Sequence, residues 1–108
     1  MHSRTKATNI PKEVKEKVWE RDNESCLVCG KWVPMECACC HIVSRARMGL
    51  GSEQNIITLC SDHHRLFDGY FRYSIYPTIR EYMKSKYPGW NEDKLVYSKW
   101  GWTHGEDK

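Results

Sequence analysis

The sequence predicts a single small domain held together by metal, with helical segments on both sides of a middle segment rich in cysteine and histidine. Three observations lead to this prediction. The chain has 108 residues, which is the length of one domain. All six cysteines, at positions 26, 29, 37, 39, 40 and 60, lie in its middle. That middle segment, residues 22–69, has few long apolar runs, so bound metal has to contribute to its folding.

Composition excludes several classes of protein. Hydrophobic residues make up 40% and charged residues 29%, which is neither disordered nor fibrous. No run of about 18 apolar residues is present, so no membrane span is expected. Residues 1–11 lack the apolar stretch of a secretory signal, so we expect a cytoplasmic protein whose cysteines bind metal rather than form disulfides. The net charge of +3 permits nucleic-acid binding without requiring it.

The N-terminal part predicts one helix. Residues 1–10 carry no pattern and are expected to form a loose tail. Pro11 suits a first helical turn, where its missing N–H has no partner to lose. Val14 and Val18 then lie on one face, with Ile10 a turn earlier, so a narrow apolar stripe is expected to face a core. The sequence therefore predicts a helix over residues 11–21.

The C-terminal part, residues 70–108, holds most of the aromatic residues and is expected to be a helical packing segment. A helix is predicted over residues 77–86, with Pro77 in its first turn and Pro88-Gly89 ending it. Asn91 is expected to cap a second short helix, and residues 101–108 are expected to fray. Basic residues lie among the aromatics. This pattern favours core packing, with nucleic-acid stacking as the alternative.

Two pairs of candidate metal ligands share one spacing. Cys26 and Cys29 are separated by two residues, and so are Cys60 and His63. Two intervening residues allow a tight turn to direct both side chains at one ion, and four such ligands are the number that structural zinc prefers. Gly30 follows the first pair and permits the positive φ of a chain reversal. A closed structural zinc site is therefore predicted, which explains stability but not activity.

The remaining Cys and His residues fall into three blocks: Cys40-His-Ile-Val-Ser-Arg-Ala-Arg-Met-Gly-Leu-Gly51, Glu53-Gln-Asn-Ile-Ile-Thr-Leu-Cys60 and His63-His64-Arg-Leu-Phe-Asp68. In this order they resemble the HNH endonuclease family, above all its small free-standing phage members. The resemblance implies an α+β fold with a ββα-metal core, in which two antiparallel strands, a long loop and a helix surround one catalytic ion. It implies one HNH domain over residues 11–108, with the zinc knuckles and the core in residues 26–69.

The resemblance also implies roles for particular residues. His41 matches the general base, Asn55 the residue that braces the loop through backbone hydrogen bonds, and His64 a ligand of the catalytic metal. The second metal ligand normally precedes the base and is Asp, His or Glu. Here that position is Cys40, which is a departure from the family pattern. Gly49 and Gly51 are expected to let the loop turn.

The chemistry of these residue types fits phosphodiester hydrolysis. A neutral imidazole with a pKa near its ordinary value of about 6.5 accepts a proton from water at physiological pH. A divalent cation, here Mg²⁺, Mn²⁺, Ni²⁺ or Zn²⁺, offsets charge on the phosphoryl and leaving oxygens. Arg45 and Arg47 in the loop are candidate DNA-phosphate contacts, and an equally weighted alternative is that they are only solvated.

The sequence thus predicts a metal-dependent endonuclease that nicks or cuts duplex DNA and leaves 5′-phosphate ends. A phage origin would place it in the bacterial host cytoplasm, with packaging proteins as possible partners. Two other classes remain open. One is a non-catalytic zinc-knuckle module that binds DNA or protein and has lost its nuclease site at Cys40. The other is a redox or metal sensor built on Cys37, Cys39 and Cys40.

Overall fold

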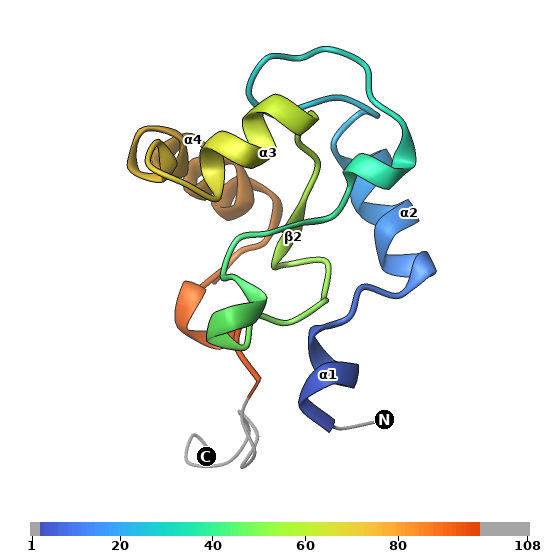
Figure 1. Ribbon diagram of the computed structural model, residues 1–108, viewed down its shortest axis with the longest axis vertical. Coiled ribbons are helices and arrows are strands. Elements are labelled where there is room, and N and C mark those ends of the chain that lie inside the picture. Colours follow the sequence, from blue (N-terminus) through green and yellow to red (C-terminus); the bar gives the residue numbers. More distant parts are fainter. Residues whose placement is uncertain (1–2, 98–108) are drawn as a thin grey trace.

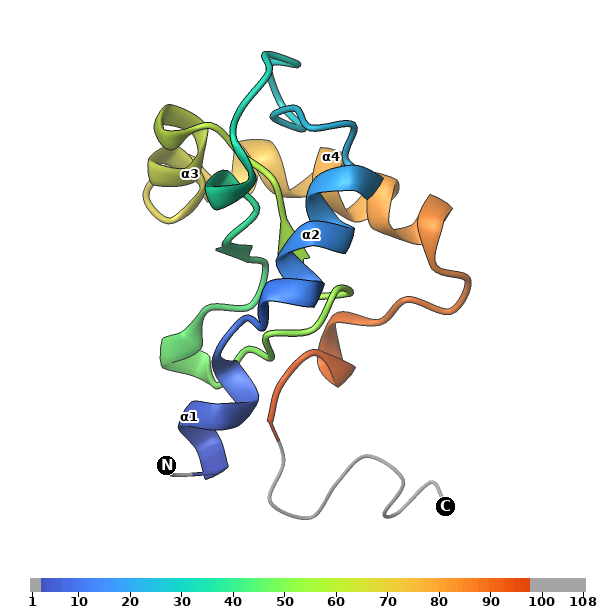
Figure 2. The same cartoon turned by 90° about the vertical axis from the view of Figure 1, so that its right-hand side faces the viewer.

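A computed structural model describes residues 3–97 and shows a small α+β fold built around two short strands (Figures 1 and 2). The strands are antiparallel, with Cys40 opposite Ile57 and His41 opposite Ile56. A long loop over residues 42–55 joins them, and a helix follows the second strand. The predicted α+β class is confirmed. The elements in order are α1 (Ser3–Thr8), α2 (Lys12–Arg21), η1 (Met35–Cys37), β1 (Cys40–His41), η2 (Arg45–Arg47), β2 (Ile56–Ile57), α3 (Ser61–Phe67), α4 (Arg72–Lys86) and η3 (Glu92–Lys94).

The strands lie in the middle, between α2 on one side and the α3–α4 pair on the other (Figure 1). Successive side chains of a strand point to opposite faces, and both faces of β2 are buried. Ile56 packs with Val18 of α2 in a small cluster, whereas Ile57 belongs to the main core with Phe67 and Met83. Within residues 3–97, no helix is long and apolar enough to cross a membrane.

Helix α2 agrees with the prediction from the sequence. Pro11 stands directly before it with an extended ψ of 155°, and the helix ends at Arg21. Val18 is fully buried, with Ile10 and Val14 packed beside the same cluster. The apolar stripe therefore faces the sheet, as its spacing requires.

A buried ion pair fixes the end of α2. The Arg21 Nε donates to Asp22 at 2.7 Å, and another Arg21 nitrogen donates to the Ile56 carbonyl at 2.8 Å. The Asp22 carboxylate accepts from the Thr58 N–H at 2.9 Å and from the Tyr82 hydroxyl of α4 at 2.6 Å. These bonds connect α2, β2 and α4 and hold the sheet in register with the helices on both sides.

The N-terminal segment corrects the prediction of a loose tail over residues 1–10. Residues 3–8 form the helix α1, and Thr8 is only 3% exposed. The Gly51 N–H donates to the Ala7 carbonyl at 3.0 Å, so the segment is fixed against the loop that joins the strands. The sequence does not predict this helix, because it has no apolar stripe of its own and contacts with distant residues hold it in place.

Helix α4 begins at Arg72, five residues before the start predicted at Pro77, and contains that proline in its interior. A proline inside a helix lacks an N–H and deprives the preceding turn of one hydrogen bond. Packing compensates for this loss. The Arg72 guanidinium donates to the Ile42 carbonyl and lies 4.5 Å from the centre of the Phe67 ring, which anchors the first turn of α4.

The C-terminal segment supports the loop from behind. Leu50 donates its N–H to the Leu95 carbonyl, and Tyr97 donates to the Met48 carbonyl, both at 2.7 Å. The Asn91 side chain caps η3 by accepting from the Asp93 N–H at 2.9 Å, as predicted, although the helix is a single 3-10 turn. The predicted fraying of residues 101–108 lies outside the described residues.

Candidate functional site

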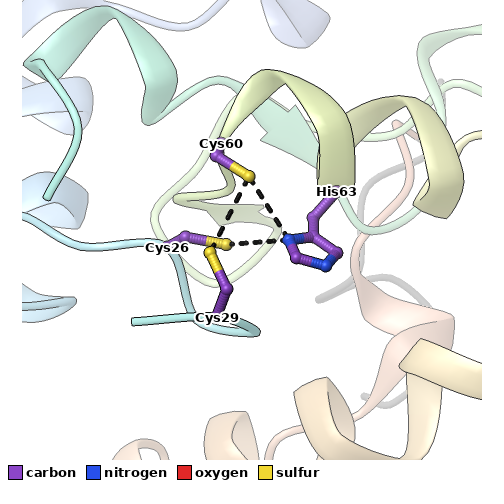
Figure 3. Close-up of side chains that lie close together, drawn as sticks. All are labelled: Cys26, Cys29, Cys60 and His63. Carbon is purple, nitrogen blue, oxygen red and sulfur yellow. Dashed lines mark hydrogen bonds between the residues drawn. The ribbon is translucent and has the colours of Figure 1, made fainter. Parts of the chain in front are cut away.

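Four predicted zinc ligands lie together at one end of the core (Figure 3). One donor atom each from Cys26, Cys29, Cys60 and His63 falls within 4.8 Å of all the others. Cys26 and Cys29 lie on either side of a tight turn that Gly30 completes with φ +77°. Cys60 immediately precedes α3, and His63 lies in the first turn of that helix.

The spacing of these donors fits a tetrahedral ion. Zinc–ligand bonds of about 2.3 Å to sulfur and about 2.0 Å to nitrogen place tetrahedral donors about 3.5–3.8 Å apart. The Cys26 Sγ lies 3.6 Å from the His63 Nδ1, the Cys29 and Cys60 sulfurs are 3.9 Å apart, and Cys60 lies 3.3 Å from His63. The four residues therefore have the chemistry and spacing of a structural zinc site.

Local backbone geometry favours the thiolate form at Cys26. Burial alone would raise the pKa of this thiol, but N–H groups of Cys29, Cys60 and Val28 donate to its sulfur. Together they lower the pKa from 9.0 to about 6. Because the thiolate is the form that binds metal, this knuckle is prepared for a cation.

A second cluster lies on the other face of α3. Consecutive helical residues project about 100° apart, so His64 points away from the zinc ligands. Its Nε2 lies 3.1 Å from the Asp68 Oδ2, and the Cys40 sulfur completes a group whose donor atoms lie within 4.8 Å of one another. The Cys39 sulfur lies 4.0 Å from the His64 Nδ1. His64 and Cys40, predicted as ligands of one ion, are thus brought together, and Asp68 joins them.

Cys40 is fully buried on β1, and its burial raises the pKa of its thiol well above the ordinary value. The next residue, His41, points the other way and is half-buried. The alternation of the strand therefore separates the candidate metal ligand from the candidate base.

The N-terminal segment holds the imidazole of His41. The His41 Nε2 lies 2.9 Å from the Thr8 carbonyl oxygen. A carbonyl only accepts, so Nε2 carries the hydrogen and Nδ1 keeps its lone pair. Burial lowers the pKa of His41, and the hydrogen bond to Thr8 partly opposes that shift. The lowered pKa keeps the imidazole neutral near pH 7, which is the form a general base needs.

Asn55 spans the loop between the strands. It is fully buried; its Oδ1 accepts from the Val43 N–H at 2.8 Å, and its Nδ2 donates to the carbonyls of Val43 at 3.1 Å and Leu50 at 2.7 Å. These three bonds are the backbone brace that the resemblance implies for this position. They hold the two ends of the loop against each other next to His41.

The two loop glycines serve close approach rather than unusual φ angles. A Cβ on Gly49 would lie 1.7 Å from the Val43 carbonyl oxygen, and one on Gly51 would lie 1.8 Å from that of Asn9. Neither glycine has a positive φ. The sequence correctly predicted that glycine matters at these two positions. The reason differs from the predicted turn: each glycine lets two backbone segments pack directly against each other.

The candidate base and candidate ligands open onto one cleft of about 630 Å³. It brings together His41, Cys39, His64, Asp68 and three arginines, Arg45, Arg47 and Arg72. Both loop arginines therefore face the cleft, and Arg45 also donates to the Asn9 side chain at 2.7 Å. Cys40 lies behind the lining, with no exposed surface.

An antiparallel strand pair followed by a helix, with metal donors gathered beside it, defines a ββα-metal fold. Residues 26–71 also match the family model described as HNH endonuclease. This match spans both candidate metal clusters and confirms the family resemblance inferred from the sequence. It supports a nuclease-type function, a nucleic-acid substrate and the use of divalent metal. No curated protein and no solved structure matches the chain.

Sequence reasoning missed three contributors to the cleft. Asp68 lies four residues after His64, a spacing that places both on one helical face and was available from the sequence. The Thr8 carbonyl carried no signal, because any residue has one. Arg72 was counted among the basic residues of the C-terminal segment, and only the fold shows that it lines the cleft.

Proposed function

We propose that this protein is a metal-dependent DNA endonuclease whose catalytic centre is the cleft that contains His41, His64 and Asp68. One observation carries the proposal. An imidazole with an oriented lone pair and a cluster of metal donors lie in the same open cleft, beside three arginines. A general base, a cation site and phosphate contacts are the parts that phosphodiester hydrolysis requires.

In this mechanism His41 acts on water. With Nε2 held by the Thr8 carbonyl, Nδ1 accepts the proton as water attacks phosphorus. Asn55 fixes the loop that begins next to His41, so His41 keeps its position when substrate binds. Arg45 and Arg47 bind the flanking phosphates, which orients the scissile bond in the cleft.

His64, Asp68 and Cys40 would hold the catalytic cation. It would offset negative charge on the phosphoryl oxygens and the leaving 3′ oxygen, so the products would carry 5′-phosphate and 3′-hydroxyl ends. Asp68 would supply an oxygen ligand and so compensate for Cys40, which stands where the family normally has Asp, His or Glu. Cys40 must lose its proton to bind, and burial opposes that loss.

The redox-sensor alternative has less support. Redox-active cysteines have lowered pKa values and are accessible. Here burial raises the pKa of Cys37, Cys39 and Cys40, which disfavours their thiolate forms as long as no metal is bound.

The test is nicking of supercoiled plasmid by zinc-loaded protein, with Mg²⁺, Mn²⁺, Ni²⁺ or Zn²⁺ added in turn. We expect metal-dependent nicks that DNA ligase reseals, because ligase requires 5′-phosphate ends. An Asp68→Asn variant should require more metal for half-maximal nicking. Absence of cleavage with all four metals, on plasmid and on single-stranded DNA alike, would reject the proposal and leave the zinc-knuckle binding module as the better account.

A further inference from the structure

Three large aromatic side chains are exposed where α3 is followed by α4. Tyr70 and Phe71 lie in the turn between the two helices, and Tyr73 lies in the first turn of α4. Tyr70 is 91% exposed, Phe71 49% and Tyr73 87%, and the Tyr70 and Phe71 rings pack edge to face with centroids 5.5 Å apart. Other aromatics of the C-terminal segment behave differently. Tyr76, Tyr82 and Trp90 pack against the core, and each makes a hydrogen bond. Within residues 70–97, these packed aromatics contrast with the exposed group of Tyr70, Phe71 and Tyr73.

The fold itself does not require this group. Helix α4 packs through Ile79 and Met83, which are fully buried, and Tyr73 projects off that face. Within residues 3–97, neither the Tyr70 nor the Tyr73 hydroxyl has a hydrogen-bond partner. Large rings that lie outside the core and are exposed to water are typical of a binding surface.

One member of the group, Tyr73, reaches the candidate catalytic cleft, and Tyr70 and Phe71 lie just before the helix that carries it. Tyr73 lines the cleft together with His41 and Asp68, and its neighbour Arg72 lines it as well. Arg45 and Arg47 add positive charge to the same lining. A ligand that crosses the cleft therefore meets guanidinium groups and, next to them, exposed aromatic rings.

We propose that Tyr70, Phe71 and Tyr73 form a stacking platform for unpaired bases, so that the substrate is DNA with a single-stranded stretch beside the cleavage point. This inference rests on the proposed nuclease function and specifies its substrate class. Alternation of positive charge with exposed aromatic rings matches the two components of a single strand, phosphates and accessible base faces. In a paired duplex the base faces are stacked on one another, so rings on the protein surface have no base to contact.

The platform is tested by binding, which does not depend on cleavage. Fluorescence anisotropy measures the affinity of zinc-loaded protein for a labelled single strand and for the same sequence as a duplex, at fixed salt and with no further divalent ion. Tyr70→Ala and Tyr73→Ala should each weaken single-strand binding by about fivefold or more, the lower end of base–aromatic stacking. Tyr73→Phe keeps the ring and should stay within about twofold of wild type, because stacking does not need the hydroxyl.

Trp32→Ala is the matched control. Trp32 is also an exposed aromatic, at 63%, but lies in the first zinc knuckle and outside the cleft lining. Its loss should not change single-strand affinity. Equal melting temperatures for all variants exclude misfolding as a cause.

Unchanged single-strand affinity in the Tyr70→Ala, Tyr73→Ala double variant would overturn the inference. An equal loss of single-strand and duplex affinity would also overturn it, because stacking on unpaired bases predicts a selective loss. So would a change from dimer to monomer without a change in DNA binding, which would show that the group contacts a second copy of this chain. If wild-type protein fails to nick any DNA but binds single strands through these tyrosines, the nuclease proposal fails while the platform stands.

Discussion

Replacing Gly51 by alanine tests whether the N-terminal segment orients the catalytic base. A Cβ at this position would lie 1.8 Å from the Asn9 carbonyl oxygen and 2.5 Å from its carbon. These are backbone atoms, so no side-chain rotation relieves the clash, and the segment from Ala7 to Ile10 has to move away from the loop. That movement separates the Thr8 carbonyl from His41.

Two magnitudes follow from this displacement. Overpacking of this kind costs about 1–3 kcal/mol, which lowers the melting temperature by several degrees but leaves a small domain folded. Loss of the hydrogen bond that orients His41 costs about 1 kcal/mol, or about fivefold in rate. The fall in nicking rate cannot exceed the whole contribution of a general base, which is about 10²- to 10⁴-fold.

The assay is single-turnover nicking of plasmid, with the melting temperature measured in parallel. Gly69→Ala is the matched control, because its Cβ would meet the carbonyl oxygens of Arg65 at 3.4 Å and Leu66 at 4.0 Å, which are ordinary contacts. ¹⁵N chemical shifts of the His41 ring give a readout that stability alone does not move. They should show hydrogen on Nε2 in wild type and a mixture of tautomers in Gly51→Ala. A wild-type nicking rate and wild-type tautomer in Gly51→Ala would refute the reasoning.

Three further predictions concern the metal sites and the loop. Cys29→Ser removes a zinc ligand, and it should lose zinc and unfold because zinc binding supplies on the order of ten kcal/mol of folding free energy. Full zinc content with an unchanged circular dichroism melting curve would refute the zinc site. Asn55→Asp keeps the oxygen that accepts from Val43 but loses both donated hydrogen bonds, so its free energy of unfolding in urea should fall by at least about 2 kcal/mol. The control Asn91→Asp keeps its capping acceptor, and its free energy of unfolding should stay within about 0.5 kcal/mol of wild type. Cys40→Ala should lose the second bound transition metal, as measured by mass spectrometry, and Cys40→Asp should shift the metal preference of nicking towards Mg²⁺ or Mn²⁺. If Cys39→Ala loses that metal and Cys40→Ala keeps it, Cys39 is the ligand.

The zinc site and the strand–loop–strand–helix order were predictable because short spacings carry the information. Two residues between Cys26 and Cys29 define a turn, and the order of the blocks from Cys40 to Asp68 defines the family motif. The backbone then has little freedom in how it brings these side chains together. The stripe of Val14 and Val18 is a similar local signal, since its period alone places it on one helical face.

The remaining parts of the cleft depend on contacts between distant residues. The Thr8 carbonyl reaches His41 across 33 positions of sequence, and a backbone oxygen has no residue type to reveal it. The local sequence predicts that the helix starts at Pro77. In the structure the helix starts five residues earlier, because Arg72 contacts Ile42 and Phe67, which are distant in sequence from Pro77. Composition likewise could not separate the exposed Tyr73 from the partly buried Tyr76, because the packing of α4 decides which face is covered.

The central claim is that His41 is the general base of a nuclease centre in this cleft, and the most direct measurement is the single-turnover nicking rate of His41→Ala. Wild type and variant are compared at equal zinc content and with matching melting curves, from preparations free of contaminating nuclease. We predict a fall in rate of about 10²- to 10⁴-fold, because proton transfer to a positioned base contributes that much. A His41→Ala protein that nicks plasmid at the wild-type rate would contradict the claim.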